Sequence, residues 1–403
     1  MMTPRRIAAA LIAAGVLLSA GCGKLLTTAP ESTDIFDAPL SGLSPADHAA
    51  FVEGDEQFGK PFAITEGLGP IFNNVSCASC HSGDGRGRPE NALTRFSMSG
   101  DLVPELGGPQ LQDRSIPGAE AERLPAGVQV SLRLPPPVFG MGLIEAIPAD
   151  SIVARADPSD LDGNGISGRP NLVSVPEFVP AHEPGGTSPA LGRFGRKAQT
   201  STLLQQTVDA YHQDIGITTD FRTVENVNPL ASRPTEAADR VADPEIPASI
   251  VRSVVAYLRL LAPPAPGEST ARREQGRALF GTVGCTGCHV PTLNTGPSAT
   301  PALANREVTL YSDLLLHDMG DGLADYRVDG DADGREWRTT PLWGLRVMRD
   351  FLNGHAFLLH DGRAGTVEAA ILLHGGEAQA ARDAFAGLTA AERAALLDFV
   401  ESR

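Results

Sequence analysis

The sequence predicts a mainly α-helical protein made of two similar modules, with long loops and a loop-rich insertion. Three observations support this fold class. Several segments show helical periodicity or helix-capping patterns, and no strand alternation is sustained. A helix followed by Cys-x-x-Cys-His occurs twice, ending at residues 77–81 and 285–289. Between the two copies, residues 148–247 are rich in Pro, Gly and Asp, which is typical of irregular connections.

Length and composition bound the class of protein. A chain of 403 residues is long enough for two or three domains. A hydrophobic content of 42% and a charged content of 20% exclude a disordered chain and a polytopic membrane protein. The net charge of −16 argues against nucleic acid as a partner, because nucleic-acid binders carry basic surfaces.

The N-terminus has the pattern of an export signal. Two arginines precede a 13-residue apolar run at 7–19, which is too short to span a bilayer. The run ends in Ser-Ala-Gly-Cys at Cys22, which resembles a bacterial lipoprotein signal. We therefore predict a signal peptide at 1–21, an exported, periplasmic protein attached to a membrane by a lipid anchor at Cys22, and a tether over 22–43. Plain secretion is the open alternative.

The helices follow in chain order. The first module is expected to begin with a helix over 44–58, and the insertion contains a further candidate over 203–211. The clearest apolar stripe lies on 248–261, which two prolines then end. A helix over 271–280 leads into the second Cys-x-x-Cys-His, and a capping box opens a last helix over 389–400.

A short Pro/Gly linker after residue 262 is the best domain boundary. It predicts an N-terminal domain over 44–262, including the insertion, and a C-terminal domain over 268–403. The two domains share a detail besides the cysteine motif: a glycine lies four residues before a phenylalanine, at Gly54–Phe58 and Gly276–Phe280.

The repeated motif predicts the cofactor. Cys77-Ala-Ser-Cys80-His81 and Cys285-Thr-Gly-Cys288-His289 have the spacing of c-type haem attachment. The two thiols add to the vinyl groups of one porphyrin, and the adjacent histidine reaches the iron. We expect two covalently bound haem c groups in two cytochrome c-like haem domains. A four-cysteine zinc site would leave both histidines unexplained, and a dithiol redox centre would need a βαβ pattern that is missing.

Spacing alone leaves the sixth iron ligands open. The other histidines and the soft methionine candidates are His48, His182, His212, His317, His355, His360, His374, Met98, Met141, Met319 and Met348.

Several further motifs resemble the di-haem oxidoreductase family, whose members are described as peroxidases and sometimes as thiol oxidoreductases. The match runs from about residue 51 to the C-terminus and is carried by Gly67-Leu-Gly-Pro-Ile-Phe-Asn73, Gly142-Leu-Ile-Glu145-Ala-Ile-Pro148, Asp214-Ile-Gly-Ile-Thr218, Tyr311-Ser-Asp-Leu-Leu-Leu-His317-Asp-Met-Gly320, Arg338-Thr-Thr-Pro-Leu-Trp343-Gly and His360-Asp-Gly-Arg363. The family is more distantly similar to bacterial di-haem cytochrome c peroxidases and to the di-haem enzyme that matures tryptophylquinone cofactors. One position departs from the pattern: Arg196 stands where the resemblance implies an aromatic residue.

The resemblance implies the iron ligands of the C-terminal haem. In the peroxidases the distal ligand follows a His-Asp-Gly motif by fourteen residues, and this spacing leads from His360 to His374. The metal ligands implied are therefore His81 at the first haem, and His289 and His374 at the second. Met319 is the open alternative to His374, while His317 and His360 are expected near the haem.

The N-terminal haem has no equally supported sixth ligand, and Met98 and Met141 stay open. An iron with an open position can bind peroxide, which also requires an acid/base group. Glu145 resembles the family's catalytic carboxylate in order and context, so the resemblance implies Glu145 as the catalytic residue.

Two acidic loops leave calcium open as a further cofactor. Residues 160–165 and 329–334 resemble the openings of calcium loops but lack the Glu at position twelve. The related peroxidases hold calcium between their haem domains, whereas the simpler interpretation is Asx turns. Candidate partners for the haem carboxylates are Arg86, Arg88, Arg335 and Arg338, and Trp343 is either an electron relay or a core residue.

The sequence thus predicts an exported di-haem c-type oxidoreductase, an enzyme of peroxidase type. Electrons from a donor protein or small redox molecule are expected to pass through the C-terminal haem to hydrogen peroxide or another oxidant at the N-terminal haem. The alternative is a non-catalytic di-haem electron-transfer cytochrome. A thiol/disulfide enzyme is disfavoured, because haem attachment uses every cysteine outside the signal region.

Overall fold

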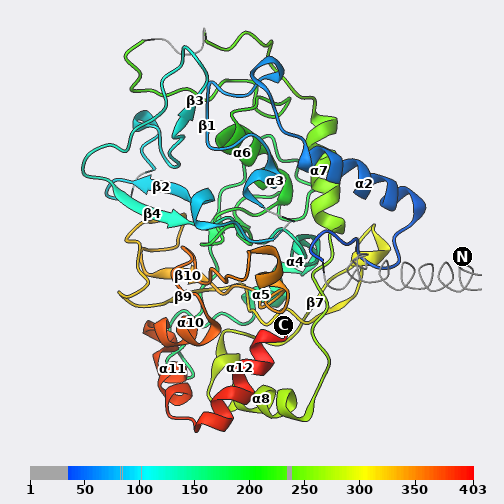
Figure 1. Cartoon of the computed structure of the whole chain (residues 1–403), viewed down its shortest axis with the longest axis vertical. Coiled ribbons are helices and arrows are strands. Elements are labelled where there is room, and N and C mark those ends of the chain that lie inside the picture. The colour runs from blue at the N-terminus through cyan, green and yellow to red at the C-terminus, as the bar shows by residue number, and fades with distance from the viewer. Residues whose placement is uncertain (1–34, 82, 84, 101, 234–237) are drawn as a thin grey trace, which may run out of the picture.

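The fold was obtained as a computed structural model, and it describes residues 35–81, 83, 85–100, 102–233 and 238–403. The predicted signal peptide, Cys22 and the tether up to residue 34 lie outside the described residues. The structure is helix-rich with little sheet, as predicted (Figure 1). Within the described ranges, no helix has the length and apolar character needed to cross a membrane.

All five predicted helices are present within one or two residues of their expected ends. The α-helices are α2 (Pro45–Gly59), α3 (Cys77–Cys80), α4 (Met141–Ala146), α5 (Ala149–Val153), α6 (Leu203–Ala210), α7 (Ala248–Leu260), α8 (Ala271–Thr282), α9 (Met348–Phe351), α10 (Val367–Leu373), α11 (Gln379–Ala386) and α12 (Ala390–Glu401). Capping explains where several begin. The Thr389 hydroxyl accepts from the Glu392 amide and the Glu392 side chain returns to Thr389, so the predicted capping box opens α12.

Short antiparallel strand pairs complete the fold, and the sequence did not predict them. They are β1 (Ile71–Phe72) with β3 (Arg114–Ser115), β2 (Leu93–Ser97) with β4 (Gln129–Arg133), β5 (Leu172–Val173) with β6 (Ala190–Leu191), β7 (Leu293–Asn294) with β8 (Glu307–Val308), and β9 (Leu316–Asp318) with β10 (Glu336–Arg338). Most are two or three residues long, which is too short for an alternation signal. The two five-residue strands, β2 and β4, are separated by residues 98–128, so no tight turn in the sequence indicates that they pair.

The first copy of the sequence repeat is a close crossing of α2 and α7. A Cβ atom on Gly54 would lie 2.1 Å from the Ser253 carbonyl oxygen, so only glycine allows this approach. One turn later, the Phe58 ring packs against Tyr257 of α7 with centroids 5.4 Å apart. The other neighbour of Phe58 is the His81 ring, at 6.1 Å.

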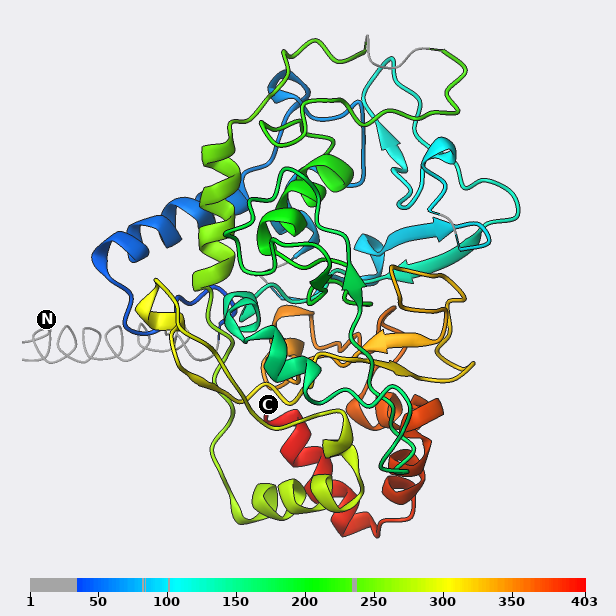
Figure 2. The ribbon, with the colours of Figure 1, turned by 180° about the vertical axis from the view of Figure 1, so that it is seen from behind.

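The second copy reproduces this packing with α8 and α12. A Cβ atom on Gly276 would lie 2.0 Å from the Ala395 carbonyl oxygen. The Phe280 ring lies 5.5 Å from Phe399 of α12 and 6.2 Å from the His289 ring. The Gly-x-x-x-Phe pattern therefore has the same physical role twice: the glycine brings two helices together, and the phenylalanine supports the motif histidine. Figures 1 and 2 show α8 and α12 at the lower end of the molecule and α2 and α7 at the side of its upper half.

Two hydrophobic cores surround these helix pairs. The larger contains buried residues of α2, α4, α6 and α7, and the smaller those of α8, α10 and α12. Residues 293–315 follow the second motif in sequence, yet most of their buried hydrophobic side chains belong to the larger core, and Tyr311 belongs to the smaller one. The chain of the C-terminal half therefore returns to pack on the N-terminal half.

Buried ion pairs also join the two halves. The Arg133 guanidinium of β4 lies 3.1 Å from Asp325 and 2.5 Å from Asp329. The Lys197 ammonium is fully buried, 2.6 Å from Asp325, and donates to two backbone carbonyl oxygens at 2.6 and 2.7 Å. Because breaking a buried pair leaves an uncompensated charge, these contacts fix β4 and the insertion against the segment 325–333.

Candidate haem sites

Each Cys-x-x-Cys-His motif opens onto a cavity of its own. Residues 77, 80 and 81 line a cavity of about 720 Å³, called here the first cavity. Residues 285, 288 and 289 line one of about 630 Å³, the second cavity. Both volumes lie in the range of cofactor sites. Because the two cysteine pairs face different cavities, the alternative of one four-cysteine zinc site is wrong.

Local backbone structure arranges both motifs alike. In the first motif, Ser76 caps α3, and the His81 amide donates to the Cys77 carbonyl oxygen at 3.0 Å. In the second, the His289 amide donates to the Cys285 carbonyl oxygen, also at 3.0 Å. One helical turn therefore presents two sulfur atoms and the following imidazole to the same cavity, as attachment of a porphyrin requires.

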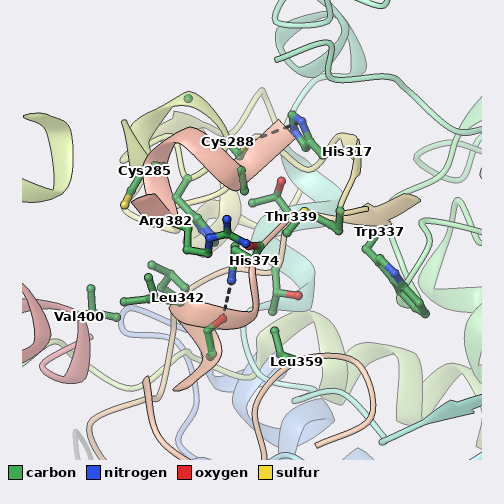
Figure 3. A pocket seen from close by; sticks show the side chains of 18 of the residues that line it. Cys285, Cys288, His317, Trp337, Thr339, Leu342, Leu359, His374, Arg382 and Val400 are labelled. Atoms are coloured by element: carbon green, nitrogen blue, oxygen red, sulfur yellow. Dashed lines mark hydrogen bonds between the residues drawn. The ribbon is translucent and has the colours of Figure 1, made fainter. Parts of the chain in front are cut away.

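Two histidines on the wall of the second cavity have Nδ1 bonded to a backbone carbonyl oxygen, and Figure 3 shows His374, one of the two, with its bond. Nδ1 of His289 donates to the Tyr311 carbonyl oxygen at 2.8 Å, and Nδ1 of His374 donates to the Ala370 carbonyl oxygen at 2.7 Å. Each bond fixes the tautomer and leaves Nε2 available as a ligand. Burial lowers the pKa of His289 to about 4 and also lowers that of His374, so both rings are neutral.

His317 lies on the same cavity wall but is already bound on both nitrogens. Nε2 lies 2.8 Å from Asp313, and Nδ1 lies 2.7 Å from Glu377 and 3.5 Å from the Cys288 sulfur. Burial disfavours its charge, but Asp313, Cys288 and Glu377 together raise the pKa of His317 to about 12. His317 is therefore an imidazolium that neighbours the motif rather than a candidate ligand.

The other expected residues of the second cavity are also present. His360 lines the wall and stacks on Trp337, with centroids 3.8 Å apart and planes 8° apart. Met319 lies on the wall as well, so the structure brings both proposed distal ligands, His374 and Met319, to this cavity. Trp343 lines it too, and its indole nitrogen donates to the Thr309 carbonyl oxygen at 2.8 Å.

The first cavity has a different wall. Burial lowers the pKa of His81 to about 4, so this imidazole is also neutral. Among the described residues that line this cavity, Met141 is the one histidine or methionine besides His81. Met98, the other sequence candidate, is absent from its described wall. The remaining polar lining includes glutamines and aspartates.

A family model described as "Di-haem oxidoreductase, putative peroxidase" matches residues 17–97 and 115–403. The chain belongs to this di-haem oxidoreductase family. The match spans nearly the whole chain and includes both cysteine motifs.

Two solved structures resemble the chain at low identity. Hydrazine synthase of Kuenenia stuttgartiensis, solved under 20 bar xenon, is 15% identical with a TM-score of 0.39, covering 94% of this chain and 96% of that one. A MauG-like protein associated with microbial copper homeostasis is 18% identical with a TM-score of 0.29, covering 66% of this chain and 87% of that one. No curated protein sequence matches. Both TM-scores are below 0.5, so these likenesses establish neither the fold nor the function of this chain.

Glu145, the residue that the family resemblance implies as catalytic, lies on α4 with its carboxylate bound. It accepts from the Leu203 amide at 2.9 Å and pairs with Arg259 at 2.6 Å. Glu145 is buried and does not appear on the described wall of either cavity, although Met141 and Leu203 beside it do. In this arrangement the carboxylate joins α4 to α6 and α7.

Two carboxylates that the sequence did not single out do line the first cavity, Asp209 and Asp214. Asp214 accepts from the Gln110 side chain at 2.5 Å. Burial raises its pKa to about 6, against the effect of the Gln110 hydrogen bond. Asp214 opens one of the motifs that the chain shares with the di-haem oxidoreductase family, and this was the signal that could have identified it.

The two acidic loops differ in what binds their carboxylates. Asp157, Asp160 and Asp162 place oxygens within 4.8 Å of one another, but Asp160 also accepts from the Gly165 amide in a local turn. In the second loop, Asp329 is buried between arginines, including Arg133 at 2.5 Å. The second loop is therefore an ion-pair site.

The four arginines proposed as partners of the haem carboxylates differ in their positions. Arg86 and Arg338 are buried on the wall of the second cavity. Arg335 is half exposed and pairs with Asp321 at 2.7 Å. Arg88 is absent from the described walls of both cavities.

Proposed function

We propose that this protein is an exported di-haem c-type oxidoreductase that reduces hydrogen peroxide or a related oxidant. Electrons from a donor protein or a small redox molecule enter at the second cavity and leave at the first, where the oxidant binds. The observation that carries the proposal is the difference between the cavities. The second has a further histidine with Nε2 available, whereas the described wall of the first has none.

The described residues fit two covalent haems. The thiols of Cys77 and Cys80, and of Cys285 and Cys288, would form the thioether links, in two cytochrome c-like domains over 44–262 and 268–403. His81 and His289 would be the proximal ligands, and His374 the distal ligand of the second haem. When bound, each haem supplies an iron that changes oxidation state and, where a position is open, accepts an oxygen ligand.

Proton transfer in the first cavity requires a nearby acid/base group. Glu145 stays the sequence-based prediction for this role, although its carboxylate is engaged by Arg259 and Leu203. Asp214 is the better placed group, because it lies on the cavity wall with a pKa raised to about 6. A buried carboxylate with that pKa can accept and release a proton near neutral pH.

A non-catalytic electron-transfer cytochrome is the second candidate. One observation favours it: Met141 lines the first cavity, and a methionine sulfur is a common axial ligand in cytochromes. With both irons six-coordinate, the protein would exchange electrons without binding an oxidant.

Electron paramagnetic resonance of the oxidised protein separates the two candidates. The oxidoreductase proposal expects one high-spin and one low-spin haem, and oxidation of the partly reduced protein by peroxide in stopped-flow measurements. Two low-spin haems, with no response to peroxide after one-electron reduction, would establish the carrier instead.

Export, lipid attachment and calcium are further parts of the proposal. The signal-like segment and Cys22 support a periplasmic lipoprotein. Replacing Cys22 by Ala should release the exported protein from membranes, and a wild type already soluble after export would refute the anchor. Asp157, Asp160 and Asp162 support one calcium site, which calorimetric titration of the metal-free protein with calcium tests.

A further inference from the structure

Three buried arginines lie together where the two cavities meet. Arg86, Arg196 and Arg338, called here the arginine cluster, are each 6–7% exposed and all line the second cavity. Arg196 lines the first cavity as well. Among the described residues, Pro137 is the one other residue on both walls, so Arg196 is the charged group that the two cavities share.

The hydrogen bonds of the arginine cluster go to neutral groups. Arg196 donates from Nε and Nη2 to the Leu134 carbonyl oxygen, at 3.2 and 2.9 Å. Arg338 donates to the carbonyl oxygens of Gly195 and Thr339, both at 3.2 Å, and Arg86 to that of Leu359. In the described part of the chain, no carboxylate forms an ion pair with any of the three.

The carboxylates whose charge acts on these arginines are already bonded to other cations. Asp361, which acts on Arg86 and Arg196, accepts from Arg363 at 2.7 Å. Asp313, which acts on Arg338, is bonded by the His317 imidazolium. Other basic groups nearby, such as Arg133, do have carboxylate partners. The arginine cluster therefore differs from its surroundings in lacking counter-charge.

Such an arrangement is unfavourable without an anion. Burial lowers the pKa of Arg86 and Arg338 to about 10 and that of Arg196 well below its usual value, where the like charges of the neighbouring arginines add to the effect. Buried charges are normally paired, and guanidinium groups bind carboxylates with two parallel hydrogen bonds. The site is thus built for carboxylate groups that enter through the cavities.

We propose that the arginine cluster binds the carboxylate side chains of both haems, and that Arg196 holds one carboxylate from each. This rests on the proposed function only in that both cavities hold haem. Arg196 stands where the family resemblance implies an aromatic residue. At this position the chain would therefore join its two cofactors through a shared positive charge. The electron affinity of each haem would then depend on the same side chain.

Redox titration of the two haems, followed by optical spectroscopy without peroxide, tests the proposal. A buried cation stabilises the more negative reduced haem, so Arg196→Gln should lower both midpoint potentials. Arg338→Gln should lower mainly that of the second haem, because Arg338 is not on the described wall of the first cavity. Arg335→Gln removes an exposed, ion-paired charge and is the matched control. A shift at one haem only in Arg196→Gln, or equal shifts in the control, would overturn the assignment.

A second measurement uses the wild type and does not depend on a variant folding. If the covalently attached cofactors supply the anions, exchanging chloride for phosphate at constant ionic strength should leave both potentials unchanged. Potentials that follow the identity of the anion would mean that the arginine cluster holds a free ion, and the proposal would fail. Neither measurement involves turnover, so a protein inert to peroxide can still support or refute the shared arginine.

Discussion

The two cavities begin from the same local structure and differ in what the rest of the chain brings to them. At both cavities, a glycine allows two helices to pack closely, and a phenylalanine one turn later packs near the motif histidine. One helical turn then positions the two cysteines and that histidine. On the wall of the second cavity, His374 follows the end of α10 and keeps Nε2 available. The described wall of the first cavity has Met141 and carboxylates instead. The geometry of the cysteine motif is thus a repeated local property, whereas the other residues of each cavity wall come from segments far from the motif.

The largest expected effect comes from removing a cysteine pair, the feature that the two cavities share. Replacing Cys77 and Cys80 together by Ala should remove one covalent haem and leave the other, because each pair lines a separate cavity. The matched variant replaces Cys285 and Cys288. Mass spectrometry of the mature chain should show two added haem masses in the wild type and one in each variant. Loss of both masses from one double replacement would mean that the cavities are not independent.

The second effect concerns His374, which lines the second cavity and has no histidine counterpart on the described wall of the first. His374→Ala should convert the low-spin signal of one haem to high-spin in electron paramagnetic resonance, with covalent attachment unchanged, because the imidazole is lost while the cysteines remain. Met319→Ala is the control, since Met319 lies on the same wall. A spin change in Met319→Ala, with none in His374→Ala, would exchange the two assignments.

The third effect compares carboxylates inside and outside the first cavity. Asp214→Asn should slow peroxide reduction by about 10²–10⁴-fold, the usual loss of a general acid/base. If the ionised carboxylate accepts the proton, the wild-type rate should fall as the pH drops below the Asp214 pKa of about 6. This dependence should disappear in the variant.

Glu145→Gln in the same assay decides the sequence-based assignment. A loss of at least about 10²-fold with normal haem spectra would identify Glu145 as the catalytic carboxylate despite its ion pair. A small loss of rate accompanied by lower stability would show that Glu145 instead holds α4 against α6 and α7. Arg259→Gln is the matched variant, because a structural ion pair predicts similar losses of stability when either partner is replaced.

The smallest expected effect is on the helix that presents His374. The Thr366 hydroxyl accepts from the Ala369 amide at 3.0 Å and caps α10. Thr366→Ala should therefore lower the free energy of unfolding by about 1 kcal/mol in chemical denaturation, while the low-spin signal persists. Thr270→Ala, which removes the corresponding cap of α8, should cost a similar amount without touching the distal side. A lost low-spin signal in Thr366→Ala would show that the cap also positions the ligand.

Local patterns were predictable from the sequence, and long-range neighbours were not. The helices, the capping box at Thr389 and the repeated Gly-x-x-x-Phe depend on residues within a few turns. The family resemblance led to His374 through its distance from His360, and the structure places both residues on the wall of the second cavity. The partner of Glu145 is Arg259, more than a hundred residues away, and nothing in a Gly-Leu-Ile-Glu segment announces that pairing. The isolated charge of Arg196 likewise arises from three segments that meet only in the folded chain.

One feature of the first cavity concerns the order of folding. Asp329, Gly330 and Asp331 line this cavity, although they follow Cys80 by roughly 250 residues in the sequence. The pocket around the first pair of thiols is therefore complete only after the later half of the chain has packed against the earlier half. A large, flat cofactor would have to reach these thiols before that step closes the pocket over it.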